Sequence, residues 1–172
     1  MSPAHLHLIL NHLPVIGTPL VLALLLWGLL RRSRDLQRAA LGAVVLLAVV
    51  SYPVFLTGEP AEEQLEDTTW YQERLVHEHE ERGEAALIAM LLTGGIAVVG
   101  LWQSRGSRPA AAGLGGITAG GLALSAALFG WTALAGGVIR HDEVRPGAAA
   151  LAPGGDGGQA ATGGGQHDGD DD

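Results

Sequence analysis

Four long apolar segments, separated by polar connections, dominate the pattern of this chain. They cover residues 6–30, 39–56, 85–102 and 110–139, and apart from histidines near the start of the first no acidic or basic residue lies between their ends. A helix needs about 20 apolar residues to cross the hydrocarbon core of a bilayer. Because these segments are apolar on all sides, they favour membrane spans over the one-sided helices of a soluble bundle. The sequence therefore predicts an all-α, four-helix transmembrane bundle.

A tail of different composition follows the predicted membrane domain, which covers residues 1–146. Residues 147–172 consist mainly of glycine, alanine and aspartate. Such a segment cannot bury enough apolar surface to fold, so we expect this tail to be disordered.

The arginines predict which way the bundle faces. The first and third connections carry an excess of them: Arg31, Arg32, Arg34, Arg38, Arg105 and Arg108. The second connection has two arginines against nine acidic residues, with a tenth, Glu84, at the membrane edge. Since arginine-rich connections stay in the cytoplasm, both termini and the acidic connection are expected outside. No basic residue precedes the first apolar segment, which favours an uncleaved first span over a signal peptide.

Composition excludes several classes of protein. The 172 residues fit one domain and a tail, and they include no cysteine, which excludes disulfides, thiolate metal sites and c-type haem attachment. A net charge of −8 without a basic patch argues against a nucleic-acid partner. No metalloprotease, nucleophile-elbow or phosphate-loop motif is present, so the sequence gives little reason to expect an enzyme.

Local signals predict three further features. Pro14 cannot donate to the carbonyl of Leu10, so the backbone of the first helix is expected to loosen there. Gly58-Glu59-Pro60 predicts the start of a short helix in the second connection. Residues 69–72 have capping-box spacing, which predicts that the third long helix begins near Trp70.

Histidine is the residue type that points to chemistry. The chain has seven: His5, His7, His12, His77, His79, His141 and His167. On the predicted topology, the first six gather at the outer rim of the bundle and the seventh lies on the tail. Imidazole is a preferred ligand of haem iron, zinc and copper, and polar groups in spans are usually kept for function.

Depth in the membrane ranks the candidate cofactor-binding residues as His12, His79, His77, His7 and His5. On a regular helix His5 and His12 share a face, whereas His7 lies on another. A ligating imidazole also needs a hydrogen-bond acceptor on its other nitrogen. The sequence offers Asn11, Glu78 and Glu81 for this role.

Three hypotheses follow from this pattern. The first is a b-type haem protein that exchanges electrons with a redox protein, a quinone or subunits of a membrane complex. The second is a zinc or copper site built from His5, His7, His12, His77, His79 and His141. The third is a structural or assembly subunit without a cofactor.

The third hypothesis has its own sequence signal in the fourth span. Small residues repeat there at intervals of four, which allows another helix to approach closely. They are Ala112, Gly116 and Gly120, and Ala119, Ala123 and Ala127.

Two stretches also carry a resemblance to a family. They are His5–Pro14 (HLHLILNHLP) and Phe55–Glu63 (FLTGEPAEE), followed by a cluster of histidine and glutamate before the third span. Over about residues 4–103 the chain resembles a group of uncharacterised bacterial four-helix membrane proteins, which implies a multi-pass protein of the bacterial inner membrane with a periplasmic rim. It is also similar to small membrane proteins thought to hold haem near span ends, which implies His12 and either His77 or His79 as ligands.

Overall fold

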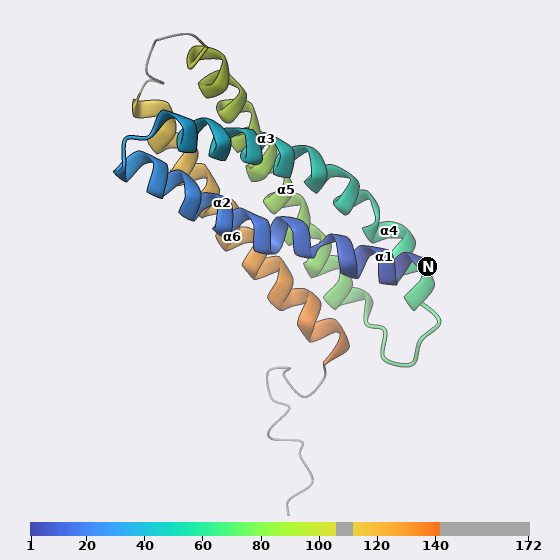
Figure 1. Cartoon of the computed structure of the whole chain (residues 1–172). Helices are drawn as coiled ribbons and strands as arrows, with labels where there is room; N and C mark the ends of the chain where they lie inside the picture. Colours follow the sequence, from blue (N-terminus) through green and yellow to red (C-terminus); the bar gives the residue numbers. More distant parts are fainter. Residues whose placement is uncertain (106–111, 142–172) are drawn as a thin grey trace, which may run out of the picture.

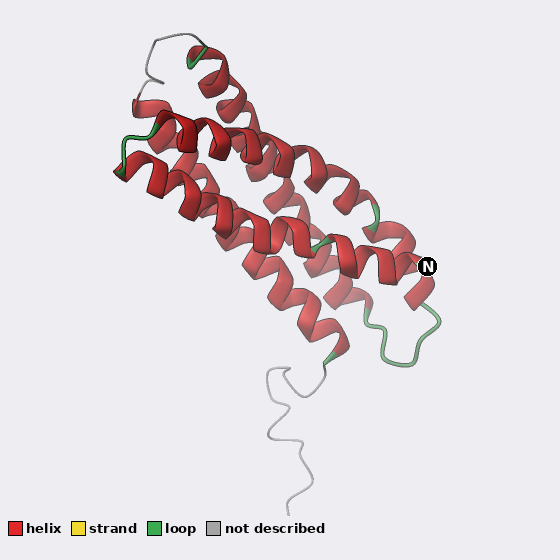
Figure 2. Ribbon diagram, viewed as in Figure 1, coloured by secondary structure: helices red, strands yellow, loops and turns green. Residues whose placement is uncertain are grey.

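The computed structural model describes residues 1–105 and 112–141, and in these ranges all regular structure is helical (Figure 2). This confirms the all-α prediction. The helices are α1 (Pro3–Leu10), α2 (His12–Leu30), α3 (Arg34–Leu56), α4 (Gly58–Leu65), α5 (Glu73–Gln103) and α6 (Ala112–Arg140). The predicted disordered tail lies outside the described residues.

The long helices α2, α3, α5 and α6 form an up-and-down bundle (Figure 1). Helix α2 packs against α3 and α6, and α5 packs against the same two helices. The short helices α1 and α4 pack against each other at the end of the bundle that carries the N-terminus. The last turn of α6 lies at the same end of the bundle: the guanidinium of Arg140 is 5.0 Å from the ring centroid of Trp70, just before α5.

All four long helical segments are long and apolar enough to cross a membrane. Their bounds are Pro3–Leu30, Arg34–Leu65, Glu73–Gln103 and Gly113–Arg140. In each segment, at most 39% of an apolar stretch of 18 residues is buried inside the bundle. Most of the apolar surface therefore faces outward, as in a protein surrounded by lipid rather than water. The helices thus indicate a membrane protein.

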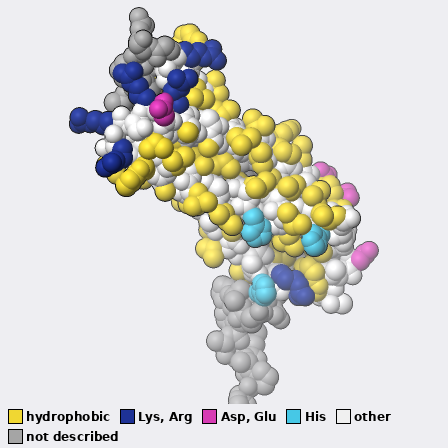
Figure 3. Space-filling view, in the orientation of Figure 1, with side chains coloured by type: hydrophobic (Ala, Val, Ile, Leu, Met, Phe, Trp, Pro, Cys, Tyr) yellow, Lys and Arg dark blue, Asp and Glu magenta, His cyan; other side chains and the backbone are white. Residues whose placement is uncertain are grey.

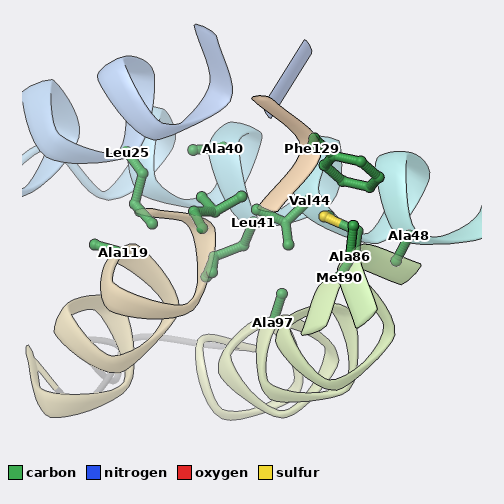
Figure 4. Close-up of a cluster of buried hydrophobic side chains, with 11 residues drawn as sticks. Leu25, Ala40, Leu41, Val44, Ala48, Ala86, Met90, Ala97, Ala119 and Phe129 are labelled. Atoms are coloured by element: carbon green, nitrogen blue, oxygen red, sulfur yellow. The ribbon is translucent and has the colours of Figure 1, made fainter. Parts of the chain in front are cut away.

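The interior of the bundle is packed with small and aliphatic side chains from α2, α3, α5 and α6 (Figure 4). Leu25, Leu41, Val44, Met90 and Leu122 are almost completely buried. The same cluster extends to Ala86 of α5 and Phe129 of α6, and so approaches the end of the bundle where α1 lies.

Glycines allow the long helices to approach closely. A Cβ atom at Gly94 of α5 would lie 2.5 Å from Cβ of Ala48 in α3, and one at Gly121 of α6 would lie 2.5 Å from Oγ1 of Thr93. Neither position has room for a side chain. Such contacts of small residues are typical of helices that associate within a bilayer.

The predicted small-residue repeats of the fourth span are divided between two surfaces of α6. Ala119 is buried, whereas Gly116, Gly120, Ala123 and Ala127 are exposed. A Cβ atom at Gly116 or Gly120 would meet nothing within 4 Å. Of these residues Ala119 helps to pack this bundle, and the outward small residues leave a smooth surface on α6.

The turn between α2 and α3 gathers arginines at the opposite end of the bundle (Figure 3). The backbone N–H of Ser33 donates to the carbonyl of Gly28, the N–H of Arg32 donates to that of Leu29, and Arg32 has a φ of 50°. This is the Schellman pattern that ends many helices. The Ser33 hydroxyl then accepts from the N–H of Leu36 and caps α3, so this helix begins before the apolar segment does.

Two of the three predicted local features are confirmed. Helix α1 ends at Leu10 and a turn at Asn11 precedes α2, as expected from Pro14. The short helix α4 begins at Gly58. The predicted capping box at residues 69–72 is wrong, because α5 begins at Glu73 and Gln72 makes no side-chain cap.

Tertiary contacts explain why the capping box does not form. The Tyr71 hydroxyl donates to Oε1 of Glu62 in α4 at 2.7 Å, and the Trp70 ring lies beside the Arg140 guanidinium of α6. These contacts hold the residues before α5 against two other helices. Side-chain contacts across the fold here outweigh a local capping preference.

The Tyr71–Glu62 hydrogen bond gives the first testable prediction. The bond to the carboxylate raises the pKa of Tyr71 to about 12. In a Tyr52→Phe background, which leaves one tyrosine, we expect tyrosinate absorbance to develop near pH 12. Replacement Glu62→Gln should lower this pKa towards about 10. Since the folded-state pKa is raised, the stabilising contribution exists below about pH 10 and is lost as pH rises through about 12. An identical titration in both proteins would contradict this contact.

Candidate histidine site

Two of the described histidines come together at the end of the bundle where α1 and α4 lie. The ring centroids of His7 in α1 and His79 in α5 are 6.3 Å apart, and the ring planes meet at 81°. Both side chains are partly buried. In Figure 3 the cyan histidines lie in the half of the molecule away from the arginine-rich turn. The pair joins residues 72 positions apart in the sequence.

A threonine fixes the orientation of His7. Nδ1 of His7 lies 2.9 Å from Oγ1 of Thr57, at the junction of α3 and α4. The Thr57 hydroxyl donates its single hydrogen to the carbonyl of Val54 at 2.6 Å. The hydroxyl must therefore accept from His7, so Nδ1 carries the proton. In the neutral ring, Nε2 of His7 keeps its lone pair.

A backbone carbonyl fixes His79 in the same tautomer. Nδ1 of His79 lies 3.0 Å from the carbonyl oxygen of Thr132 in α6. A carbonyl can only accept, so Nδ1–H donates and Nε2 of the neutral ring keeps its lone pair. Because metals bind the unprotonated nitrogen, both rings of the pair are prepared for ligation.

Glycines border both rings. A Cβ atom at Gly136 of α6 would lie 3.1 Å from Cε1 of His79, and one at Gly58 of α4 would lie 3.9 Å from Cε1 of His7. The His79 ring thus lies directly against the backbone of α6. The site has contributions from α1, α4, α5 and α6.

The other predicted ligands are not part of this pair. His12, the first-ranked candidate, is exposed, and its Nδ1 donates to the carbonyl of Leu8 at 2.6 Å. His77 is 69% exposed and its Nε2 lies 3.4 Å from Oε1 of Glu81. His5 and His141 are also exposed. His167 lies outside the described residues.

The groups that accept hydrogen bonds from the paired histidines are not the predicted ones. Thr57 and the Thr132 carbonyl hold the paired rings, whereas Glu81 contacts His77 and Glu78 forms ion pairs with Arg74 and Arg82. Thr57 stands inside the FLTGEPAEE stretch and could have been considered from the sequence. The Thr132 carbonyl is a backbone group, which no residue pattern identifies.

The second hypothesis requires more ligands than are brought together. Within residues 1–105 and 112–141, no three or more His, Cys, Asp or Glu side chains are grouped so that they could hold a metal ion. Zinc sites use three or four protein ligands. The pair of His7 and His79 offers two.

None of the family models, curated proteins or solved structures with which the chain was compared matches it. The fold and site themselves define a class: an all-helical protein with four helices able to span a membrane and a histidine pair at one end of the bundle.

Proposed function

We propose that this protein binds one b-type haem with His7 and His79 as axial ligands and serves electron transfer in a membrane. The observation that carries the proposal is the isolated pair of imidazoles with matching tautomers. A haem supplies four equatorial nitrogens of its own, and a bis-histidine haem takes two imidazoles from the protein. The number of ligands in the pair is therefore the number that such a haem needs.

The spacing of the rings supports the same ligand arrangement. Two imidazoles on opposite sides of one metal ion, each with a nitrogen about 2.0–2.1 Å from it, have ring centroids roughly 6 Å apart. The centroids of His7 and His79 are 6.3 Å apart. The lack of a side chain at Gly136 is what lets the His79 ring lie against α6 at this position.

The supports of the two rings suit an electron-transfer role. A bound haem supplies one-electron chemistry. Thr57 and the Thr132 carbonyl keep Nδ1–H of each ring hydrogen-bonded, which orients the imidazoles and raises their basicity. Because these acceptors belong to the helical scaffold, they would hold both rings in place around a bound haem.

The proposal includes a topology and a location. The arginine-rich end would face the cytoplasm and the histidine end the periplasm, with both termini outside, in the inner membrane of a bacterium. This is the arrangement of the bacterial four-helix group that the chain resembles, and we propose that it belongs there. The electron partner would be a periplasmic redox protein, a quinone or another subunit of a membrane complex.

An absorption spectrum of the detergent-purified protein tests the function, with metal analysis of the same sample. The protein should be produced where haem is plentiful and measured before and after reduction by dithionite. A Soret band that shifts on reduction is the expected result. A colourless protein would contradict the haem proposal. In that case, stoichiometric zinc or copper would favour a metal-binding protein, and no bound metal would favour a structural subunit.

Reporter fusions test the topology separately. A reporter that works only in the periplasm should be active when it is fused after residue 141. A reporter that works only in the cytoplasm should be active when it is inserted at residue 33. The opposite pattern would contradict the proposed orientation but leave the ligands unaffected.

The glycine beneath His79 gives a prediction with a matched control. In Gly136→Ala the new Cβ would lie 3.1 Å from the His79 ring, so the hydrogen bond from His79 to Thr132 should lengthen. Haem affinity should fall about 10-fold, the lower end of the range for losing a ligand's hydrogen-bond partner. Gly137→Ala adds a methyl group with nothing within 4 Å and should leave affinity unchanged. The measurement is haem titration of both proteins, and equal affinities would contradict the described packing.

A further inference from the structure

Arg82 is a cation close to the histidine pair that the axial ligation does not use. It follows His79 by three residues on α5, so the two share one side of the helix. Its Nη2 lies 3.5 Å from Oε2 of Glu78, one turn towards the start of α5. The side chain therefore runs back along the helix, and its charge lies near the level of His79.

The same segment of α6 positions both Arg82 and His79. The Arg82 guanidinium lies 4.5 Å from the ring centroid of Trp131, and the next residue, Thr132, supplies the carbonyl that holds His79. Stacking on an aromatic ring restricts the guanidinium without using its N–H donors. Apart from Nη2, which lies 3.5 Å from Glu78, the donors remain available for an anion.

Glu78 shares its carboxylate between two arginines. Glu78 forms ion pairs with both Arg74 and Arg82, so this trio carries one more positive than negative charge. The Arg74 side chain is 74% exposed and the Arg82 side chain is 24% exposed. An additional carboxylate would gain more from the less exposed guanidinium, where water screens less. Glu78 would keep Arg74 as its partner if Arg82 turned to another anion.

We propose that Arg82 binds a carboxylate side chain of the macrocycle held between His7 and His79. The inference rests on the proposed haem function and adds the residue that would recognise the edge of the haem. The two propionates are the anionic groups of b-type haem, and a guanidinium pairs with a carboxylate through two parallel hydrogen bonds. Arg82 would thereby set how the macrocycle is rotated about the axis between the imidazoles.

The test compares haem with its dimethyl ester, in which both carboxylates are blocked. Haem-free protein in detergent is titrated with each compound, for the unaltered chain and for Arg82→Gln. We expect Arg82→Gln to weaken haem binding about 10-fold, the value of one charge-assisted pair, and to leave binding of the ester unchanged. Arg82→Lys, which keeps the charge but loses the fork, should show an intermediate loss.

Arg140→Gln is the matched control, because Arg140 lies at the same end of the bundle but its guanidinium lies against Trp70 rather than Trp131. It should bind both compounds like the unaltered chain. Equal weakening of haem and ester by Arg82→Gln would overturn the inference, since the loss would then reflect packing on Trp131. Unchanged haem binding would also overturn it. Failure of the unaltered chain to bind either compound would instead refute the haem function itself.

Discussion

Removing either imidazole of the pair is expected to abolish six-coordinate haem binding. In His79→Ala and in His7→Ala the iron would lose one of its two protein ligands. Haem affinity should fall by about 100-fold or more, since loss of a ligand's hydrogen-bond partner alone costs up to about 100-fold. The Soret band of any remaining haem should change to that of a five-coordinate form. Haem titration followed by absorbance measures both effects.

The controls are two histidines that are not part of the pair. His12→Ala and His77→Ala should retain the spectrum and affinity of the unaltered chain. His12 is exposed and bonded to the carbonyl of Leu8 in the preceding helix, and His77 is exposed beside Glu81. If His12→Ala removed the haem while His7→Ala retained it, the assignment of His7 would be wrong. The ranking by depth in the membrane would then be correct.

The second large effect is expected where α5 crosses α3. In Gly94→Ala the new Cβ would be 2.5 Å from Cβ of Ala48, and neither methyl group can rotate away. The helices must separate, and we expect the free energy of unfolding to fall by about 1–3 kcal/mol, the usual cost of overpacking. Unfolding in a denaturing detergent, followed by circular dichroism, measures it.

The neighbouring glycine is the control for this substitution. A Cβ atom at Gly95 would meet nothing within 4 Å, so Gly95→Ala should leave the free energy of unfolding unchanged or raise it by up to about 1 kcal/mol through helix propensity. Equal destabilisation by the two substitutions would show that helix flexibility, rather than contact with Ala48, is the property that matters.

The features that could be predicted from the sequence depend on local chemistry. Long apolar segments dictate helices that satisfy their own backbone hydrogen bonds, and the break at Asn11 follows from the missing N–H of Pro14. The short helix at Gly58 follows in the same way from residues within one turn. None of these features requires knowledge of what lies beside each segment.

The pairing of His7 with His79 could not be predicted, because it depends on how separate helices pack. Depth in the membrane favoured His12, but burial is decided by the helix face. His5 and His12 share the exposed side, whereas His7 lies on the side that reaches Thr57. The N–H of Ala4 donates to Oε1 of Gln64 at 3.1 Å and fixes α1 on α4. That contact joins residues 60 positions apart.

The electron paramagnetic resonance spectrum of the oxidised, haem-loaded protein tests the central claim most directly. Two axial imidazoles with nearly perpendicular planes give a strongly anisotropic low-spin iron signal, and the 81° between the ring planes of His7 and His79 predicts this type. A high-spin iron signal would contradict the account, because one imidazole would then be missing from the iron.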